Sequence, residues 1–352
     1  MPRRAPWPRL LAGACLLPVL LAAGPLAAEP GRATAAARNP ASSASSTLRL
    51  NGIEYVEARA FFARYGLKAS WLEASRKLQA ASTWTKIELE ADKREITLNG
   101  LRLFLGEGVA AAHGTLYVSR IDADKLLTPI LRPASVPGRV PELKVIAVDA
   151  GHGGQDTGTQ NKALKLHEKG FALDVARQVT QLLRSRGYKV VMTRDDDRFI
   201  DLEERAAIAK RAGADLFISI HFNSVEGAPA VRGTETFVMT PRYHRSTQPE
   251  RDKEMIPTVY PGNKFDAWNA VLGYAVHRQL LGKLGTFDRG LKRMRFVVLR
   301  SAPCPSVLVE AGYLSNDAEA RKIGTAAYRG DIAEAIVNGV NAYAAQLDAA
   351  RK

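Results

Sequence analysis

Residues 143–158 read LKVIAVDAGHGGQDTG, and this stretch decides the fold. Its first half is dominated by apolar residues, which is typical of a strand buried in a parallel sheet with both faces covered. The strand pattern leads to a histidine, His152, that is surrounded by glycines. Glycine lets the backbone come close to a bound group. The stretch therefore predicts an α/β domain with a functional group at the end of its first strand.

Strand and helix patterns alternate along the rest of the chain. Helical periodicity marks residues 171–187, 201–213, 265–285 and 327–347, and apolar strand patterns mark residues 188–194, 215–222, 234–239, 296–300 and 305–313. Asp201 and Glu204 are expected to form a capping pair at the start of the second helix. Alternating strands and helices indicate a largely parallel or mixed sheet with helices on both faces. Residues 143–347 are therefore predicted to form one α/β domain.

The region before this domain has a different pattern. Residues 48–132 are expected to form a small α+β domain, with a helix over residues 55–66 and a hairpin that turns at Asn99 and Gly100. Residues 133–142 contain three prolines and are predicted to be a linker. The sequence thus indicates two folded domains joined by a short connection.

The N-terminus has the layout of a secretory signal peptide. Residues 1–10 hold three arginines and no acidic residue, and a short apolar stretch ending in small residues follows. We expect cleavage near Ala28, with an uncleaved membrane anchor as the alternative. Residues 29–47, rich in alanine and serine, are predicted to be a flexible linker. Without residues 1–28 the mature chain would have no stable membrane span and one cysteine, Cys304, which excludes an internal disulfide.

The net charge of the chain indicates which classes of partner it binds. The formal net charge is +14 at pH 7, which favours nucleic acid, acidic lipid or an anionic cell-wall polymer. Export would keep the protein away from cytoplasmic nucleic acid. We therefore expect a protein of the periplasm or the extracellular cell wall.

Side chains that bind metals stand at the ends of the predicted elements. His152, His221 and Glu310 each end a strand pattern, and Glu168 comes just before the first long helix. Two imidazoles and one carboxylate match catalytic zinc, which takes three nitrogen or oxygen ligands, and a second carboxylate could accept the proton of an attacking water. The residues alone leave two interpretations open, because a histidine at the end of a strand can also be purely structural.

Four stretches together resemble one family. They are IAVDAGHGGQDTG (146–158), LHEKGFALDVA (166–176), FIDLEERAAIAKRAGADLFISIHFNS (199–224) and PSVLVEAGYLSN (305–316). The chain resembles the zinc-dependent N-acetylmuramoyl-L-alanine amidases of bacterial cell walls, in the class with an α/β catalytic domain. The resemblance covers residues 143–347, with the motifs in the order and spacing of the family.

The resemblance implies a role for each matching residue. His152 in GHGG, Glu168 in LHEKG and His221 in SIHFN correspond to the three zinc ligands, and Glu310 in VLVEAGY corresponds to the catalytic glutamate. Asn223 corresponds to a residue that lines the site. The implied reaction is hydrolysis of the amide between N-acetylmuramic acid and L-alanine of peptidoglycan, in wall remodelling or cell separation. A zinc peptidase acting on the stem peptide and a non-catalytic wall-binding regulator are the alternatives.

The chain departs from the family pattern in two places. Gly170 stands where an acidic residue often follows the lysine. Residues 239–266 form a long polar insertion. In some relatives an inserted helix covers the zinc until an activator protein displaces it. We expect the insertion to act as a lid over the site or as part of the substrate groove, with a solvated loop as the alternative.

Residues 48–132 resemble, more loosely, the domain named after the N-terminus of copper amine oxidases. The likeness lies in NGIEYVEARAFFARYGLKASW (51–71). It implies a wall-binding or spacer role and no copper, and an AMIN-type targeting domain is the alternative identity.

Overall fold

The computed structural model describes residues 47–248 and 256–352 of the 352-residue chain. The predicted signal peptide and most of the predicted linker at residues 29–47 lie outside these residues. These described residues belong to one compact unit. The boundary predicted at residues 133–142 lies inside this unit, and the division into two domains stays a prediction. Within the described ranges, no helix combines the length and the apolar composition that crossing a bilayer requires.

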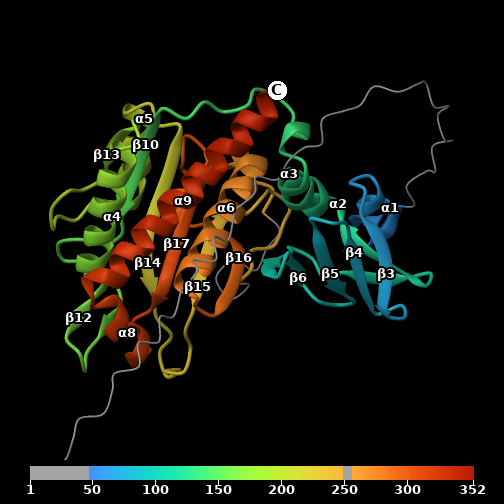
Figure 1. Cartoon of the computed structure of the whole chain (residues 1–352), viewed down its shortest axis with the longest axis horizontal. Coiled ribbons are helices and arrows are strands. Elements are labelled where there is room, and N and C mark those ends of the chain that lie inside the picture. The colour runs from blue at the N-terminus through green and yellow to red at the C-terminus, as the bar shows by residue number, and fades with distance from the viewer. Residues whose placement is uncertain (1–46, 249–255) are drawn as a thin grey trace, which may run out of the picture. The chain divides into compact units, whose positions relative to one another are not determined.

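The N-terminal segment, residues 47–131, is built mainly of strands (Figure 1). Its elements are β1 (Thr47–Leu50), β2 (Ile53–Glu57), α1 (Ala58–Ala63), β3 (Lys68–Glu73), β4 (Lys77–Ala81), β5 (Lys86–Glu90), β6 (Glu95–Leu98), β7 (Leu101–Phe104), β8 (Ala110–Ala112), β9 (Thr115–Ser119), α2 (Arg120–Asp122), η1 (Ala123–Leu127) and α3 (Thr128–Leu131). The hairpin from β6 to β7 turns at Asn99 and Gly100 as predicted, and both residues have positive φ. The helix predicted over residues 55–66 is shorter, because Tyr55 and its neighbours pair with β9 as a strand.

The rest of the chain contains the alternating elements. They are η2 (Pro133–Ser135), β10 (Val145–Ala150), β11 (Gln160–Asn161), β12 (Leu166–His167), α4 (Glu168–Arg184), β13 (Lys189–Met192), α5 (Leu202–Arg211), β14 (Leu216–Asn223), β15 (Thr234–Met239), η3 (Pro261–Phe265), α6 (Asp266–Leu284), β16 (Asp288–Met294), α7 (Val297–Arg300), β17 (Ser306–Tyr313), α8 (Asp317–Ile323) and α9 (Ala326–Arg351).

One large mixed sheet organises these elements. Its strand order is β13-β10-β14-β17-β15-β16, and it continues through β7-β6-β5-β4-β3 of the N-terminal segment. The first four strands are parallel neighbours, β15 runs antiparallel to β17, and β16 is parallel to β15. The α/β class and the mixed sheet predicted from the sequence are confirmed.

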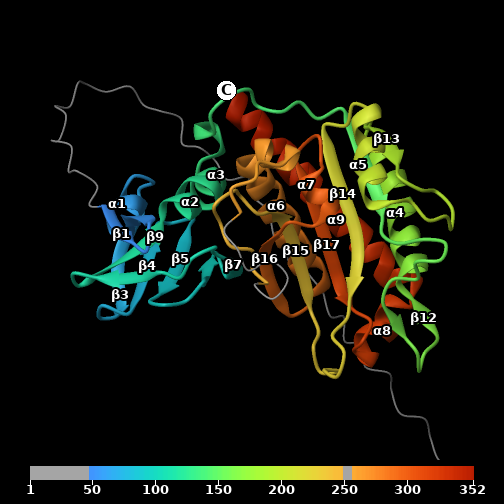
Figure 2. The same cartoon turned by 180° about the vertical axis from the view of Figure 1, so that it is seen from behind.

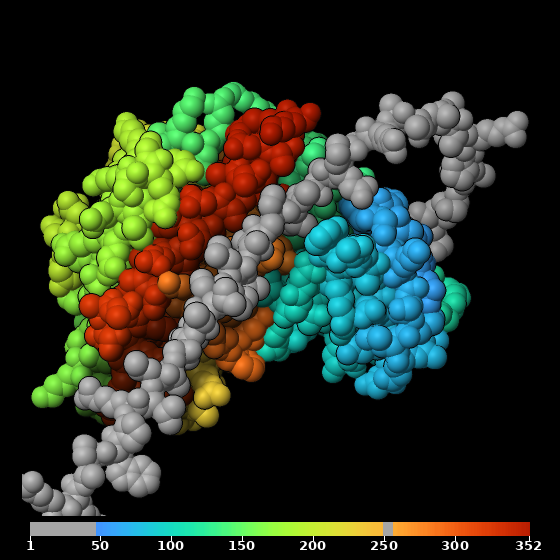
Figure 3. All heavy atoms as spheres, viewed as in Figure 1, coloured from blue at the N-terminus to red at the C-terminus, as the bar shows by residue number. Residues whose placement is uncertain are grey.

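Helices cover both faces of the sheet. On one face, α4 contacts β10 and β14, α6 contacts β15 and β17, and α9 packs against both helices (Figures 1 and 3). On the other face, seen in Figure 2, α5 and α7 pack against each other, and α7 contacts β15 and β17. Burial between these layers explains why the strands are apolar along most of their length.

One strand lies at a different place from the one predicted. Residues 296–300 contain the short helix α7, and the strand precedes them as β16. Its sequence, DRGLKRM, does not read as a strand because of its charges. Lys292 and Arg293 are nevertheless buried, because they form ion pairs with Glu235 and Asp122.

The capping pair predicted at the start of α5 does not form. Asp201 occupies the N-cap position, but its side chain makes no capping hydrogen bond. Glu204 forms an ion pair with Arg211 instead. The helix starts here without the side-chain contact that the sequence predicts.

Candidate metal centre and active-site cavity

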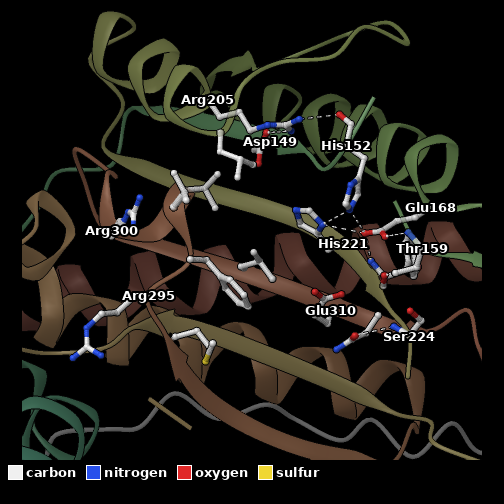
Figure 4. A pocket seen from close by; sticks show the side chains of 18 of the residues that line it. Asp149, His152, Thr159, Glu168, Arg205, His221, Ser224, Arg295, Arg300 and Glu310 are labelled. Carbon is white, nitrogen blue, oxygen red and sulfur yellow. Dashed lines mark hydrogen bonds and ion pairs between the residues drawn. The ribbon is translucent and has the colours of Figure 1, made fainter. Parts of the chain in front are cut away.

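Four side chains near the carboxyl ends of the strands face one cavity (Figure 4). His152 follows β10, His221 lies near the end of β14, Glu310 lies in β17, and Glu168 is the first residue of α4. Because β10, β14 and β17 are parallel neighbours, their carboxyl ends meet at one edge. His221 and Glu310 are direct partners in the register, which places their Cα atoms about 5 Å apart.

The side chains of His152, Glu168 and His221 converge on one point. His152 Nε2 and His221 Nδ1 each lie 3.0 Å from Glu168 Oε1. The two imidazole nitrogens lie 3.2 Å apart, and one ligand atom from each residue lies within 4.8 Å of the others. Two imidazole nitrogens and a carboxylate oxygen form a donor set that suits a divalent cation such as zinc. The three residues therefore form a candidate metal centre.

Glu168 is held in place by backbone groups. Its side chain is buried, Oε2 accepts a hydrogen bond from Thr159 N at 2.8 Å, and Oε1 accepts one from Phe222 N at 2.9 Å. Burial alone would raise the pKa of this carboxyl, but the hydrogen bonds from His152 and His221 outweigh burial and hold the pKa well below its usual range. Glu168 is therefore an ionised carboxylate with a fixed orientation.

The imidazole ring of His152 is oriented by a contact at Nδ1, the nitrogen that does not face Glu168. Its Nδ1 lies 2.8 Å from Asp156 Oδ2, so the carboxylate accepts from Nδ1 and Nε2 is left to face the centre. Carboxylates stand behind metal-binding histidines in this way because they fix the tautomer and the ring orientation. Gly151 gives the other imidazole its space, since a Cβ there would lie 2.3 Å from His221 Cε1.

A buried carboxylate, Asp149, anchors the strands behind the centre. Its oxygens accept hydrogen bonds from Thr193 Oγ1 and Ser219 Oγ, each at 2.6 Å, and from Arg205 Nη1 at 2.9 Å. Burial would raise the pKa of Asp149, but the charge of Arg205 lowers it below its usual range. Sequence reasoning missed this pair, although an acid inside the apolar run VIAVDA signals a buried partner.

Two buried arginines fix the loop that carries His152. Arg205 donates to the backbone oxygens of Ala150 at 2.7 Å and His152 at 2.9 Å. Arg194 donates to the oxygens of Ala150 at 3.0 Å and Gly151 at 2.6 Å. The backbone of the GHGG loop is thus held by guanidinium groups from two other parts of the chain. Sequence reasoning missed both arginines.

The candidate centre lies at one side of a cavity of about 610 Å³. Glu310 and Asn223 also line this cavity. Figure 4 shows Arg295 and Arg300 on the side away from His152 and Glu168. Apolar and aromatic side chains also line the cavity: Tyr260, Met294, Phe296, Val298 and Leu308. The carboxylates of Glu168 and Glu310 thus lie on the side of the candidate centre, and the guanidinium groups of Arg295 and Arg300 lie on the far side.

Glu235 lies on the strand next to Glu310 and was missed by sequence reasoning. The two are direct partners in the antiparallel register of β15 and β17. Glu235 accepts from Lys292 Nζ at 2.7 Å and from Tyr313 Oη at 2.6 Å. Burial would raise the pKa of Glu235, but the charge of Lys292 lowers it. Asn223 Nδ2 donates to Glu235 at 3.2 Å, which fixes the amide at the cavity.

The insertion at residues 239–266 is described except for residues 249–255. His244 is buried, its Nε2 lies 2.9 Å from Asp122 Oδ1, and it is not one of the three converging residues. Tyr260 lines the cavity. The insertion thus contacts both the N-terminal segment and the cavity, and its role as a lid stays a prediction.

Gly158 lies beside the centre and should be sensitive to substitution. It has φ +66, and a Cβ there would lie 2.6 Å from both Glu168 Oε2 and His152 Cδ2. Gly158→Ala is therefore expected to displace both ligands and to lower metal affinity by about 10–100-fold. Titration of the metal-free chain with zinc measures this. Gly170→Ala is the control, because no atom lies within 4 Å of its Cβ position; equal affinities of the two variants would contradict the prediction.

Comparisons with known proteins single out the same region. A family model described as N-acetylmuramoyl-L-alanine amidase matches residues 146–342. This range includes His152, Glu168, His221 and Glu310.

Individual relatives match over 57–60% of this chain. The uncharacterized protein YqiI of Bacillus subtilis (strain 168) is 36% identical over 213 residues, which are 60% of this chain and 91% of YqiI. N-acetylmuramoyl-L-alanine amidase AmiA of Escherichia coli (strain K12) is 33% identical over 57% of this chain and 76% of AmiA. N-acetylmuramoyl-L-alanine amidase LytC of Bacillus subtilis (strain 168) is 34% identical over 57% of this chain, but the match spans 35% of LytC.

Proposed function

Because the chain belongs to the N-acetylmuramoyl-L-alanine amidase family, we propose that it hydrolyses the amide between N-acetylmuramic acid and L-alanine of peptidoglycan, with zinc held by His152, Glu168 and His221. The observation that carries this proposal is the convergence of the three side chains in a cavity that Glu310 also lines. The donor set fits zinc because each residue supplies one nitrogen or oxygen ligand and three ligands leave a position open.

In the proposed reaction, Glu310 moves the proton. Zinc bound by His152, Glu168 and His221 would polarise a carbonyl as a Lewis acid and would lower the pKa of a bound water to about 7. Glu310, the register partner of His221, acts as general base and accepts the proton of the attacking water. The water oxygen bonds to the carbonyl carbon, the bond from this carbon to the L-alanine nitrogen breaks, and Glu310 gives the proton to that nitrogen. The products are a lactyl carboxylate and a stem peptide with a free amino group.

Other cavity residues are assigned to substrate binding. Asn223 lines the cavity with its amide held by Glu235, so we assign it to orienting the substrate. The cationic groups of Arg295 and Arg300 line the far side, where they suit the carboxylates of a stem peptide. The net charge of +14 favours an anionic wall polymer over a neutral one.

The proposed substrate requires export of the protein. Peptidoglycan lies outside the cytoplasmic membrane, and the signal-peptide layout of residues 1–28 supports delivery to the periplasm or the cell wall. A wall-binding or spacer role for residues 48–132, and an activator that acts on residues 239–266, stay predictions.

Muropeptide analysis tests the proposed activity. Purified peptidoglycan is incubated with the full chain, and the soluble products are identified by mass spectrometry. We expect free stem peptides that begin with L-alanine, together with glycan strands that keep the lactyl group. Shortened peptides still attached to the glycan would indicate a peptidase instead, and no product at all would indicate a non-catalytic wall-binding protein.

The same assay identifies the metal. Treatment with a chelator is expected to stop the release of stem peptides, and zinc added after removal of the chelator should restore it. Magnesium and manganese serve as matched additions, because they prefer oxygen ligands to imidazole. Full activity in the chelator would contradict the metal part of the proposal.

A further inference from the structure

Part of the cavity wall is built on β16. Met294 ends this strand, and Arg295, Phe296, Val297 and Val298 follow it directly. All five residues line the cavity. A displacement of β16 would therefore move the surface that faces the substrate.

The N-terminal segment completes the sheet beside β16. β16 pairs with β15 on one side and with β7 on the other, where Leu103 is the partner of Leu291. Arg102 reinforces this contact, since its backbone N donates to Asp288 Oδ2 at 2.8 Å and its Nη1 donates to Asp288 O at 3.0 Å. Without β7, β16 would be an edge strand with unpaired backbone groups.

Asp122 at the end of α2 holds the end of β16 that is nearest the cavity. Its side chain is completely buried. Asp122 Oδ1 accepts hydrogen bonds from Arg293 Nη1 and His244 Nε2, each at 2.9 Å. Within the N-terminal segment, Ser119 Oγ donates to Oδ2 at 2.7 Å and Gly106 N donates to Oδ1 at 3.1 Å. One carboxylate thus links the N-terminal segment, β16 and the insertion.

The contacts continue from Asp122 to the cavity wall. The backbone oxygen of His244 accepts from Arg295 Nη2 at 2.6 Å, and Arg295 lines the cavity. Thr247 N donates to Arg293 O, and Thr247 Oγ1 accepts from Arg293 N, both at 2.9 Å. Gly106 leaves the imidazole its space, because a Cβ there would lie 1.9 Å from His244 Nε2. The insertion is therefore bound both to Arg293 in β16 and to Arg295 in the cavity wall.

The charge of Asp122 is essential to this arrangement. Burial would raise its pKa, but the charges of His244 and Arg293 hold the pKa well below its usual range. The carboxylate is therefore ionised at neutral pH. Arg293 is itself buried, so loss of the carboxylate would leave a buried guanidinium without its counterion, which strongly favours rearrangement.

We propose that Asp122 is a positioning residue, which holds the wall at residues 294–298 in the conformation that binds the stem peptide. The N-terminal segment is then part of the catalytic unit and not only a tethered wall-binding module. This inference rests on the proposed function, because it concerns substrate binding in the same cavity.

The test compares two buried substitutions in the full chain. Asp122→Asn keeps the shape of the side chain and removes its charge. Leu89→Ala opens the core of the N-terminal segment and removes no hydrogen-bond partner of Asp122. With a soluble muropeptide as substrate, Asp122→Asn is expected to raise KM about tenfold or more with little change in kcat or metal content. Leu89→Ala should lower the unfolding temperature and leave KM unchanged. An unchanged KM for Asp122→Asn, or an equal rise for Leu89→Ala, would overturn the proposal.

A second pair decides the question if Asp122→Asn does not fold. Arg293→Lys keeps a cation for Asp122, whereas Arg293→Met keeps only the bulk of the side chain. KM should be higher than in the wild type for the methionine variant and closer to the wild-type value for the lysine variant. Equal KM values for the two variants would overturn the proposal. A wild-type chain that leaves the muramoyl–alanine bond intact would overturn the proposed function itself, so the two failures are distinguishable.

Discussion

Glu310→Gln is expected to lower kcat by about 10²–10⁴-fold, the usual contribution of a general base. The substitution keeps the size of the side chain but removes the carboxylate that would take the proton from water. The three converging ligand atoms come from His152, Glu168 and His221, so the metal content of the variant should equal that of the wild type. Release of stem peptides from peptidoglycan gives kcat, and elemental analysis of the same sample gives the metal content.

Glu203→Gln is the matched control for this loss. Glu203 is an exposed acid in the first turn of α5, it pairs with Arg300 at 3.8 Å, and it does not line the cavity. Its substitution removes one negative charge near the cavity and should leave kcat within about twofold, since an exposed ion pair contributes little. If Glu310→Gln retained a tenth or more of the wild-type kcat, the base would have to be another group.

The candidate site residues at the ends of strands could be predicted, because each strand is indicated by an apolar run in its own sequence. An apolar run such as LKVIA predicts its own strand, and alternation with helices predicts parallel neighbours. The carboxyl ends of such strands meet at one edge, so His152 and His221 were expected near each other, and the structure brings them to 3.2 Å. The position of Glu310 next to His221 follows from the register of β14 and β17.

The position of β16 and the ion pairs beside the cavity could not be predicted, because they depend on partners far apart in the sequence. Asp122 and Arg293 are 171 residues apart, and neither side chain has a local pattern that indicates the other. The sequence of β16 is typical of a polar loop, because Lys292 and Arg293 are charged. Their ion pairs with Glu235 and Asp122 offset the cost of burying these charges. The sequence therefore predicts the elements that carry the candidate ligands, whereas the ion pairs beside the cavity could be identified only from the structure.

His221→Ala is expected to abolish both metal binding and turnover. His221 supplies one of three converging ligand atoms, and its removal leaves one imidazole and one carboxylate, which hold zinc far more weakly. Zinc that binds only the folded chain stabilises it by about 2.7 kcal/mol at a concentration 100 times Kd. Zinc should therefore raise the unfolding temperature of the wild type, measured by calorimetry, and should leave that of His221→Ala unchanged.

His167→Ala separates loss of a ligand from loss of any histidine near the centre. His167 directly precedes Glu168 but is exposed to solvent and is not one of the converging residues. The variant should keep the zinc-dependent rise in unfolding temperature and the wild-type kcat. If His221→Ala still gained stability from zinc, or if both variants lost it, the ion would bind elsewhere or through other residues. The pair of variants thus tests the assignment of the centre by a readout that does not depend on activity.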